Sequence, residues 1–329
     1  MKAAVITSRG TVGIETIEDP TPKPNEVVVR VSACGICGTD LHILDDDFQG
    51  TFPITPGHEF AGEVVALGSA YTSRKIGDRV AVDPSLYCFD CYYCKRGHNN
   101  LCERWGAIGV TSPGGAAEYA AVPGANCVLL PDFVRTEDAA LIEPLSCAVR
   151  GYDVLKQQLG ATVLIYGAGT MGLMMLALAK SVGSTTVHVV DPNEERLDTA
   201  KLLGVTSTAS SPDEFEMPRG WQVVIDASGN EGAIQDGLSR VGAGGTFLQF
   251  GVADTRARVT IDPFRIYNKE ITITGSMAVL NSFNRAAELF ATGIIDPEVF
   301  ISDRLPLEEY PMALNRFASG IGRKIQVVS

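Results

Sequence analysis

Short apolar segments separated by Gly and Pro dominate roughly the first 125 residues of the chain. They are rich in Val, Ala and Ile, and they include KAAVIT (2–7), EVVVRVSA (26–33), AGEVVALG (61–68), DRVAV (78–82) and AAEYAAVP (116–123). Runs of this length that are bounded by turn residues favour strands over helices. The pattern predicts an irregular, largely antiparallel β domain.

From about residue 145, apolar strand-like runs alternate with helix-like segments that often end in Gly. The predicted strands are TVLIYG (162–167), TVHVVD (186–191), VVIDAS (223–228), GTFLQFG (245–251) and EITITGS (270–276). The predicted helices are TMGLMMLALAKSVG (170–183), NEERLDTAKLLG (193–204), AIQDGLSRVG (233–242) and SFNRAAELFATG (282–293). This alternation predicts an α/β fold with a doubly wound parallel sheet. We expect domains at 1–144 and 145–282, and a segment at 283–329 whose final KIQVVS strand rejoins the first domain.

Composition narrows the class of protein. A chain of 329 residues and 35.0 kDa is long for one core and fits two domains. A net charge of −12 argues against nucleic acid as a partner. No apolar run approaches the roughly 20 residues that span a bilayer, and MKAAVITSRG lacks the apolar core of a signal peptide. We therefore expect a cytoplasmic protein with no membrane partner. Since thiols stay reduced there, the eight cysteines suggest metal binding or catalysis before disulfides.

The segment GAGTMG places Gly167, Gly169 and Gly172 in GxGxxG spacing between a predicted strand and a helix. Such a turn lets the backbone and the helix N-terminus approach a pyrophosphate, and Asp191, which ends the next strand, can accept hydrogen bonds from ribose hydroxyls. Because a carboxylate repels a 2′-phosphate, NAD is favoured over NADP. The alternative is a packing turn followed by an Asp cap. The predicted cofactor residues are Gly167, Gly169, Thr170, Met171, Gly172, Asp191, Arg196, Ser228, Phe250, Gly251 and Ser276.

The segment CFDCYYCKRGHNNLC (88–102) holds four cysteines at Cx2Cx2Cx7C spacing. A disulfide clasp, a redox pair and an iron–sulfur site are the alternatives to zinc. Four thiolates would fill the coordination shell of zinc and leave no position for water or substrate. We therefore predict a structural zinc bound by Cys88, Cys91, Cys94 and Cys102 in a lobe at 86–104.

A second candidate metal site is dispersed along the chain. Cys37 in CGICGTDLH and His58 in TPGHEFAGEV are glycine-flanked and suit zinc. Glu59 and Glu143, the latter in ALIEPLSCAV, are the available oxygen ligands. The residues alone leave open which carboxylate binds a metal there.

These motifs occur in the order seen in zinc-dependent medium-chain alcohol dehydrogenases, and IEPLS makes the chain resemble the sorbitol and polyol dehydrogenase branch. The resemblance implies a GroES-like β domain that binds zinc, a Rossmann domain that binds NAD, and two zinc ions per chain. It implies that Cys37, His58 and Glu59 hold the catalytic zinc, with Glu143 bound directly or through water. It further implies that Thr39 takes the substrate proton, that His42 passes it on, and that Asp40 orients His58.

We expect reversible oxidation of a secondary alcohol, on a polyol or sugar alcohol, to a ketone by hydride transfer to NAD. The alternatives are a 2,3-butanediol or L-threonine dehydrogenase of the same family, and a non-catalytic NAD-binding redox sensor. Dimer and tetramer both fit, with ITITGS (271–276) as the edge strand that would pair between subunits. The candidate pocket residues are Phe48, Arg150, Ser276 and Met277.

Overall fold

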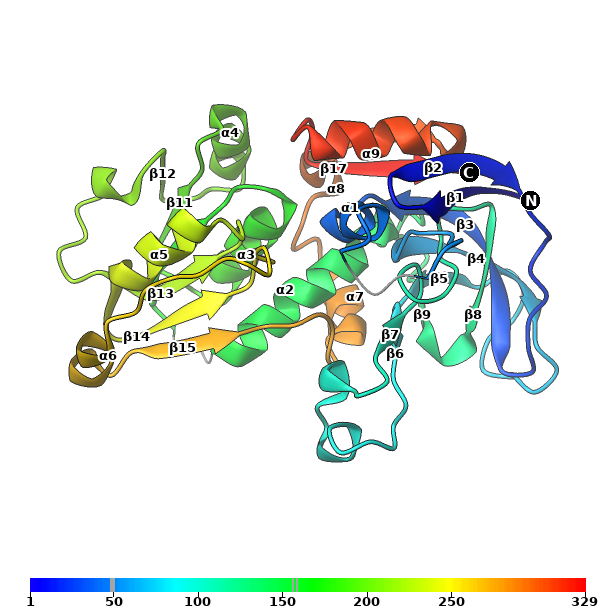
Figure 1. Cartoon of the computed structure of the whole chain (residues 1–329), viewed down its shortest axis with the longest axis horizontal. Helices are drawn as coiled ribbons and strands as arrows, with labels where there is room; N and C mark the ends of the chain where they lie inside the picture. The colour runs from blue at the N-terminus through cyan, green and yellow to red at the C-terminus, as the bar shows by residue number, and fades with distance from the viewer. Residues whose placement is uncertain (48–50, 156, 158) are drawn as a thin grey trace. The chain divides into compact units, whose positions relative to one another are not determined.

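The computed structural model describes residues 1–47, 51–155, 157 and 159–329. Two compact units make up the chain (Figure 1). Unit 1 comprises Met1–Ser146 and Val279–Ser329, and unit 2 comprises Cys147–Ala278. The boundary falls inside α2 (Ile142–Leu155). Phe48, a candidate pocket residue, lies outside the described residues.

Unit 1 is built on a mainly antiparallel sheet in the order β16-β17-β3-β4-β5-β9, with β8 also paired to β3. Two small sheets, β1-β2 and β6-β7, accompany it. The strands of unit 1 are β1 (Lys2–Ser8), β2 (Thr11–Thr16), β3 (Glu26–Gly35), β4 (Glu59–Leu67), β5 (Arg79–Val82), β6 (Ser85–Leu86), β7 (Gly106–Ala107), β8 (Tyr119–Pro123), β9 (Cys127–Leu129), β16 (Ile301–Pro306) and β17 (Lys324–Val328). Its helices, besides the first turn of α2, are α1 (Gly38–Leu44), α7 (Phe283–Ala291), α8 (Pro297–Phe300) and α9 (Tyr310–Ala318).

The core of unit 1 lies between this sheet and α9. Val27, Val29 and Val31 of β3 alternate into it and pack with Phe60 of β4, as the period of two residues in a strand requires. α9 contributes Tyr310 and Leu314 and lies against β17 (Figure 1). The C-terminal strand β17 pairs antiparallel with β3, with Gln326 opposite Gly35. Residues from both ends of unit 1's sequence therefore meet around the end of β3.

Unit 2 contains a six-stranded parallel sheet in the order β12-β11-β10-β13-β14-β15 (Figure 1). The strands are β10 (Thr162–Tyr166), β11 (Thr186–Val190), β12 (Ser207–Ala209), β13 (Trp221–Asp226), β14 (Val241–Gln249) and β15 (Thr272–Gly275). The helices, besides the rest of α2, are α3 (Thr170–Ser181), α4 (Glu194–Leu202), α5 (Glu231–Arg240) and α6 (Pro263–Lys269). The predicted doubly wound parallel sheet is confirmed.

The register of this sheet brings the carboxyl ends of five strands into one row. Tyr166 lies opposite both Val190 and Asp226, Asp226 lies opposite Gln249, and Gln249 lies opposite Gly275. The loops that follow these strands therefore gather at one edge, where ligands bind in open parallel sheets.

In the parts of the chain that the structure describes, no helix combines the length and the apolar character needed to cross a membrane.

Candidate functional site

Cys37 is held at the N-terminus of α1, directly after β3. Its backbone N–H donates to Asp40 Oδ2 at 2.8 Å, which satisfies one of the free N–H groups that every helix start leaves. Asp40 is fully buried. The short helix therefore fixes the position of the Cys37 side chain through the backbone.

The structure brings Cys37, His58 and Glu59 together, although they come from two segments of the sequence. One potential ligand atom from each lies within 4.8 Å of the other two. His58 and Glu59 are buried and Cys37 is half-buried. A thiolate, an imidazole and a carboxylate form a donor set that suits zinc, and catalytic zinc sites keep three protein ligands and one open position. The residues present therefore fit the metal that the sequence predicts.

Two buried polar atoms beside this group support the same assignment. Asp40 Oδ1 and His58 Nδ1 lie 3.8 Å apart, and neither makes a hydrogen bond within the described residues. Burial lowers the pKa of His58, but Cys37, Asp40 and Glu143 outweigh it, and the pKa is raised well above its usual value. The negative charge that Cys37, Asp40 and Glu143 contribute around His58 would also attract a divalent cation. A small shift would also let Asp40 orient the imidazole, as carboxylates do beside metal-bound histidines.

Glu59 has a partner that the sequence analysis did not identify. Lys324 Nζ, from β17, donates to Glu59 Oε2 at 2.7 Å and to Glu59 Oε1 at 2.8 Å. Burial lowers the pKa of Lys324, but the charges of Glu59 and Cys37 raise it more, so its net pKa lies above the usual value. A lysine at the start of the apolar strand KIQVV was the signal in the sequence.

The other predicted residues of this site are less closely grouped. Glu143 is buried in the first turn of α2 and contributes to the field at His58, but it is outside the group of three ligand atoms. Thr39 Oγ1 lies 3.7 Å from Cys37 Sγ. His42 is exposed in the last turn of α1, three residues after Thr39 and so on the same helical face.

The Gly-rich turn has the shape that a phosphate-binding loop needs. Gly167 has a φ of +97°, which favours glycine. A Cβ on Gly172 would collide with the carbonyl oxygen of Gly167, so the helix can pack this closely only without a side chain. A Cβ on Gly169, the residue before α3, would have no described atom within 4 Å outside its chain neighbours. Open space therefore lies beside Gly169, where Thr170 and Met171 begin α3.

Asp191 lies next to this turn at the end of β11. Its Oδ2 accepts from the Ala168 N–H at 2.7 Å, and its Oδ1 accepts from the Asn193 N–H at 2.8 Å. Arg196 Nη1 lies 4.0 Å from Asp191 Oδ2. The Asp191 carboxylate is thus hydrogen-bonded to the backbone of the Gly-rich turn, and the Arg196 guanidinium lies near it.

Asp226, which the sequence analysis did not single out, organises the other predicted cofactor residues. Its side chain accepts from the Ser228 hydroxyl at 2.6 Å and from Gln249 Nε2 at 2.7 Å. Its backbone carbonyl accepts from the N–H groups of Phe250 and Gly251. Asp226 is fully buried and ends β13, so a polar residue at the end of an apolar strand was the signal.

Three further candidates belong to unit 2. Ser276 follows β15 at the same edge, and its N–H donates to the carbonyl of Gln249 at 3.2 Å. Arg150 lies half-buried in α2, and Met277 is exposed just after Ser276. Neither Arg150 Nε nor Ser276 Oγ makes a hydrogen bond within the described residues. Both atoms are also buried.

A cavity of about 850 Å3 in unit 2 lies at the opposite edge of the sheet. The first residues of three strands, Thr162, Trp221 and Val241, line it. Arg240 in its wall is paired with Asp213 at 2.7 Å and with Asp236 at 2.9 Å. The cavity is thus separate from the predicted cofactor residues.

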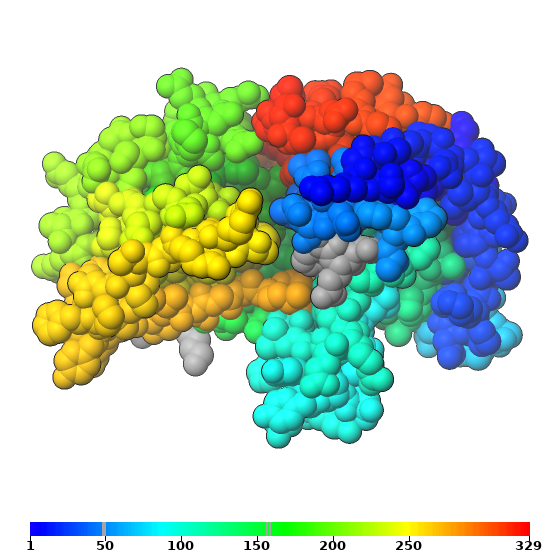
Figure 2. Space-filling model, viewed as in Figure 1, coloured from blue at the N-terminus to red at the C-terminus, as the bar shows by residue number. Residues whose placement is uncertain are grey.

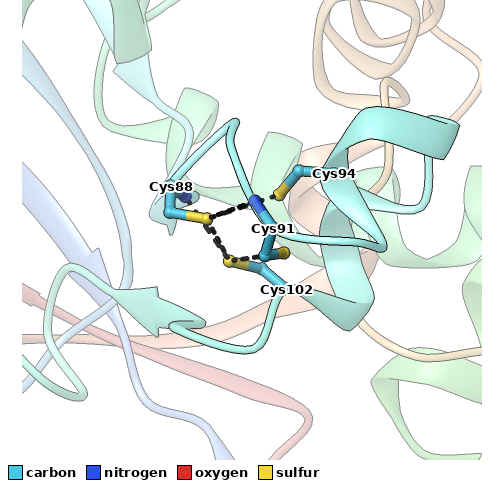
Figure 3. A group of neighbouring side chains, drawn as sticks. All are labelled: Cys88, Cys91, Cys94 and Cys102. Atoms are coloured by element: carbon cyan, nitrogen blue, oxygen red, sulfur yellow. Dashed lines mark hydrogen bonds between the residues drawn. The ribbon is translucent and has the colours of Figure 1, made fainter.

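The four cysteines of the lobe converge on one point, as Figure 3 shows. Cys88 Sγ lies 3.4 Å from Cys102 Sγ and 4.0 Å from Cys94 Sγ, and Cys91 Sγ lies 3.9 Å from Cys102 Sγ. A tetrahedron with zinc–sulfur bonds of about 2.3 Å has sulfur–sulfur edges of about 3.8 Å. None of the eight cysteines forms a disulfide in the part of the chain that the structure describes. The spacing of the four lobe sulfurs suits one ion better than a multi-iron cluster, in which several metal atoms hold the ligands farther apart.

The surroundings of the lobe sulfurs supply hydrogen bonds to them and change the pKa values of their thiols. Backbone N–H groups donate to them, from Cys91 to Cys88 Sγ at 3.3 Å and from Arg104 to Cys102 Sγ at 3.3 Å. The N–H of Asp90 and then the side chain of Arg104 lower the pKa of Cys88 to about 5. Burial raises the pKa of Cys94 to about 12, so this thiol would have to lose its proton to a metal. The lobe, cyan in Figure 2, projects from the surface of unit 1.

Comparison with known proteins agrees with this geometry. Residues 23–132 match the family described as the alcohol dehydrogenase GroES-like domain, and residues 170–292 match the family described as zinc-binding dehydrogenase. D-arabinitol dehydrogenase 1 of Uromyces fabae is 37% identical over 92% of this chain and 90% of its own length. Sorbitol dehydrogenase of Bacillus subtilis is 35% identical over 96% of this chain and 93% of its own.

A solved structure from Sinorhizobium meliloti 1021, described as a zinc-binding dehydrogenase bound to NADP, has a TM-score of 0.96 and 35% identity. It covers 100% of this chain, which covers 99% of it. The fold and the site thus define a dehydrogenase with a GroES-like unit and a Rossmann unit. The chain belongs to the zinc-binding alcohol dehydrogenase family, as its motifs predicted, and it is an enzyme.

Proposed function

We propose that this protein oxidises a secondary hydroxyl of a polyol to a ketone, reversibly, with NAD as the hydride acceptor. The observation that carries the proposal is the convergence of Cys37, His58 and Glu59 beside the buried Asp40. Relatives along nearly the whole chain are an arabinitol and a sorbitol dehydrogenase, which favours a polyol. When bound, zinc supplies a Lewis acid that makes a hydroxyl group more acidic, and NAD supplies the hydride acceptor.

The residues of unit 1 would hold the metal and move the proton. Cys37 and His58, with a carboxylate from Glu59 or Glu143, would hold the catalytic zinc. Asp40 would fix the orientation of the His58 ring. Thr39 Oγ1 would accept the substrate proton, and the exposed His42 would release it to water. The lobe cysteines would hold a second, structural zinc, with every coordination position occupied.

Unit 2 would bind the dinucleotide at the edge of its sheet. The pyrophosphate would lie over Gly169 at the start of α3, where the backbone leaves open space. Asp191 would accept hydrogen bonds from the adenosine ribose and disfavour a 2′-phosphate. Ser228, Phe250, Gly251 and Ser276 would line the rest of the cofactor site.

The direct test is the formation of NADH from NAD, or of NADPH from NADP, with D-arabinitol, sorbitol and xylitol, with 2,3-butanediol, and with L-threonine. We expect kcat/KM to be highest for a polyol and higher with NAD than with NADP. A higher kcat/KM for L-threonine or 2,3-butanediol would replace the polyol by that substrate. The absence of turnover with every alcohol in a zinc-loaded sample would favour a redox sensor.

We also propose that the protein is a homodimer or a homotetramer. β15 is an edge strand of the described sheet, and edge strands offer unpaired backbone groups to a second chain. Ile273 in β15 is 45% exposed, and Phe264 and Tyr267 of α6 are 70% and 81% exposed. Sedimentation equilibrium should give two or four chains, and a monomer at micromolar concentration would exclude this proposal.

A cytoplasmic location fits the chemistry of the two metal sites. The described residues contain no disulfide, and thiolate ligands persist where glutathione keeps thiols reduced. Cell fractionation should recover the protein with cytoplasmic markers, and recovery from an oxidising compartment would contradict this location.

A further inference from the structure

Lys324 is a buried cation directly beside the candidate catalytic metal group. Its side chain is 3% exposed, and that of Glu59 is 2% exposed. Lys324 Nζ donates to both carboxylate oxygens of Glu59 and to the carbonyl oxygen of Ile36, the last at 3.0 Å. An ammonium group has three N–H donors, and these three acceptors account for all of them. The lysine therefore has a single, fully bonded arrangement.

The backbone holds both partners in place. Lys324 begins β17, where it pairs with Ile301 of β16, and two residues later Gln326 pairs with Gly35 of β3. Glu59 begins β4 and also lies opposite Gly35. A Cβ on Gly35 would collide with Glu59 Oε2, so this position needs glycine for the carboxylate to lie where it does. The ion pair is thus fixed by the sheet rather than by flexible side chains.

We propose that Lys324 is a positioning residue that competes with zinc for the Glu59 carboxylate and so weakens Glu59 as a metal ligand. The inference rests on the proposed function, since it requires zinc at Cys37 and His58. Both oxygens of Glu59 already accept hydrogen bonds from a cation, which withdraws the electron density that a metal would use. A buried ammonium group also repels a dication over a short distance in a medium of low dielectric constant.

Weak ligation by Glu59 has a consequence for the site. Cys37 and His58 would carry most of the metal affinity, and Glu59 would leave and rejoin the metal with little change in free energy. Such exchange would keep one coordination position accessible to an alcohol. Lys324 would in this way set both the zinc affinity and the ease with which the position opens.

The alternative is a purely structural ion pair that fastens β17 to β4. That role predicts a loss of stability when Lys324 is replaced, without a gain in zinc affinity. The two roles therefore differ in the direction of the change in metal binding, which can be measured without turnover.

The experiment measures zinc release from the full-length protein to a chromophoric chelator. Zinc release from the two proposed sites should give two kinetic phases, and the phase that Cys37→Ala removes belongs to the candidate catalytic site. We expect Lys324→Met to slow that phase and tighten zinc binding by about tenfold. Removing a partner that supports a metal ligand typically costs about 10- to 100-fold in affinity, and the sign reverses here because Lys324 opposes the metal. Lys324→Arg keeps the positive charge although its geometry differs, so folded Lys324→Arg should not show the slower zinc release of Lys324→Met.

A second variant guards against misfolding of Lys324→Met. Lys324→Gln keeps an N–H donor for Glu59 but has no charge, and it should also slow zinc release. Arg316→Met is the matched control, because it removes a cation paired with Asp303 at 2.9 Å in the same unit, outside the metal group. Arg316→Met should leave the rate of zinc release from the candidate catalytic site unchanged.

Unchanged or faster zinc release in folded Lys324→Met, or in Lys324→Gln if the first variant does not fold, would overturn the inference while leaving the proposed function intact. The lack of any phase sensitive to Cys37→Ala in the wild type would instead overturn the proposed function, and the inference with it.

Discussion

Gly169 and Gly172 occupy the same motif but are constrained by different neighbours. Gly172 lacks room for a side chain because the carbonyl of Gly167 is in the way. A Cβ at Gly169 would have room among the described residues, so a need for glycine there would come from a bound cofactor. The two glycines should therefore separate a requirement of folding from the proposed requirement of cofactor binding.

Gly169→Ala should therefore leave the fold intact and weaken cofactor binding. We expect the free energy of unfolding to stay within about 1 kcal/mol of wild type, since Gly to Ala at an unstrained position is neutral or stabilising. The Kd for NADH, measured by titration of nucleotide fluorescence, should rise at least about tenfold, or about 1.4 kcal/mol.

Gly13→Ala in β2 is the matched control, because its added Cβ also has no described atom within 4 Å outside its chain neighbours and lies in unit 1. It should leave the Kd for NADH unchanged. An unaltered Kd in Gly169→Ala would show that the open space beside Gly169 is not the pyrophosphate site.

Single residues also show how far the sequence could predict the site. Cys37 and His58 were predicted because their residue types and glycine neighbours suggest metal binding. Glu59 was one of two candidate carboxylates, beside Glu143, and the structure groups Glu59 with Cys37 and His58. Lys324 was missed because 265 residues separate it from Glu59, and only the pairing of β17 with β3 brings them together. Asp226 was missed because the side chain of Gln249 and the backbone of Phe250 and Gly251, which donate to it, belong to a later strand and loop that no sequence pattern places beside it.

Secondary-structure elements were predictable where their pattern is strong. The strands β10, β11, β13 and β14 are apolar runs, and their order with α3, α4 and α5 follows from the alternation in the sequence. β12 was not predicted because its three residues, Ser207–Ala209, lack an apolar pattern and form a strand through pairing with β11. The order of the strands in unit 1 was not predictable, because distant segments pair to form that sheet.

The cysteine lobe is an element whose stability should depend on its metal. It is held together by short turns, among them the 3-10 helices Cys94–Arg96 and Asn99–Leu101, and its cluster of buried residues consists of three of its own cysteines. Without zinc such a small element buries too little apolar surface to stay folded.

Cys94→Ser should lower the melting temperature by about 5 °C or more, as expected when an element of this kind loses its cross-link. The zinc content should fall by one ion per chain. Rapid-mixing measurement of the hydride-transfer step, with saturating NAD and polyol, should give a rate within about twofold of wild type, because a zinc bound by all four thiolates would leave no coordination position open to substrate.

Cys127→Ala is the control, because Cys127 is fully buried in the core of unit 1 and outside both metal groups. It should lose some stability and keep both zinc ions. Normal thermal stability together with slow hydride transfer in Cys94→Ser would instead give the lobe a catalytic role.

At the scale of the whole molecule, the candidate metal groups and the candidate cofactor residues lie in different units. Unit 1 holds both cysteine-containing metal groups, and unit 2 holds the Gly-rich turn with Asp191 and Asp226. Metal loss and cofactor loss should therefore be separable by mutation. This independence gives the central claim, that Cys37 belongs to a catalytic zinc site, a clean test.

The decisive measurement is the zinc content and NADH formation of Cys37→Ala beside the wild type. We expect two zinc ions per chain in the wild type and one in the variant. Turnover with the best polyol should fall by more than about 100-fold, because removing a direct ligand should exceed the effect of removing a ligand's hydrogen-bond partner. The Kd for NADH should stay unchanged. Two retained zinc ions, or undiminished turnover, would contradict the assignment of this site.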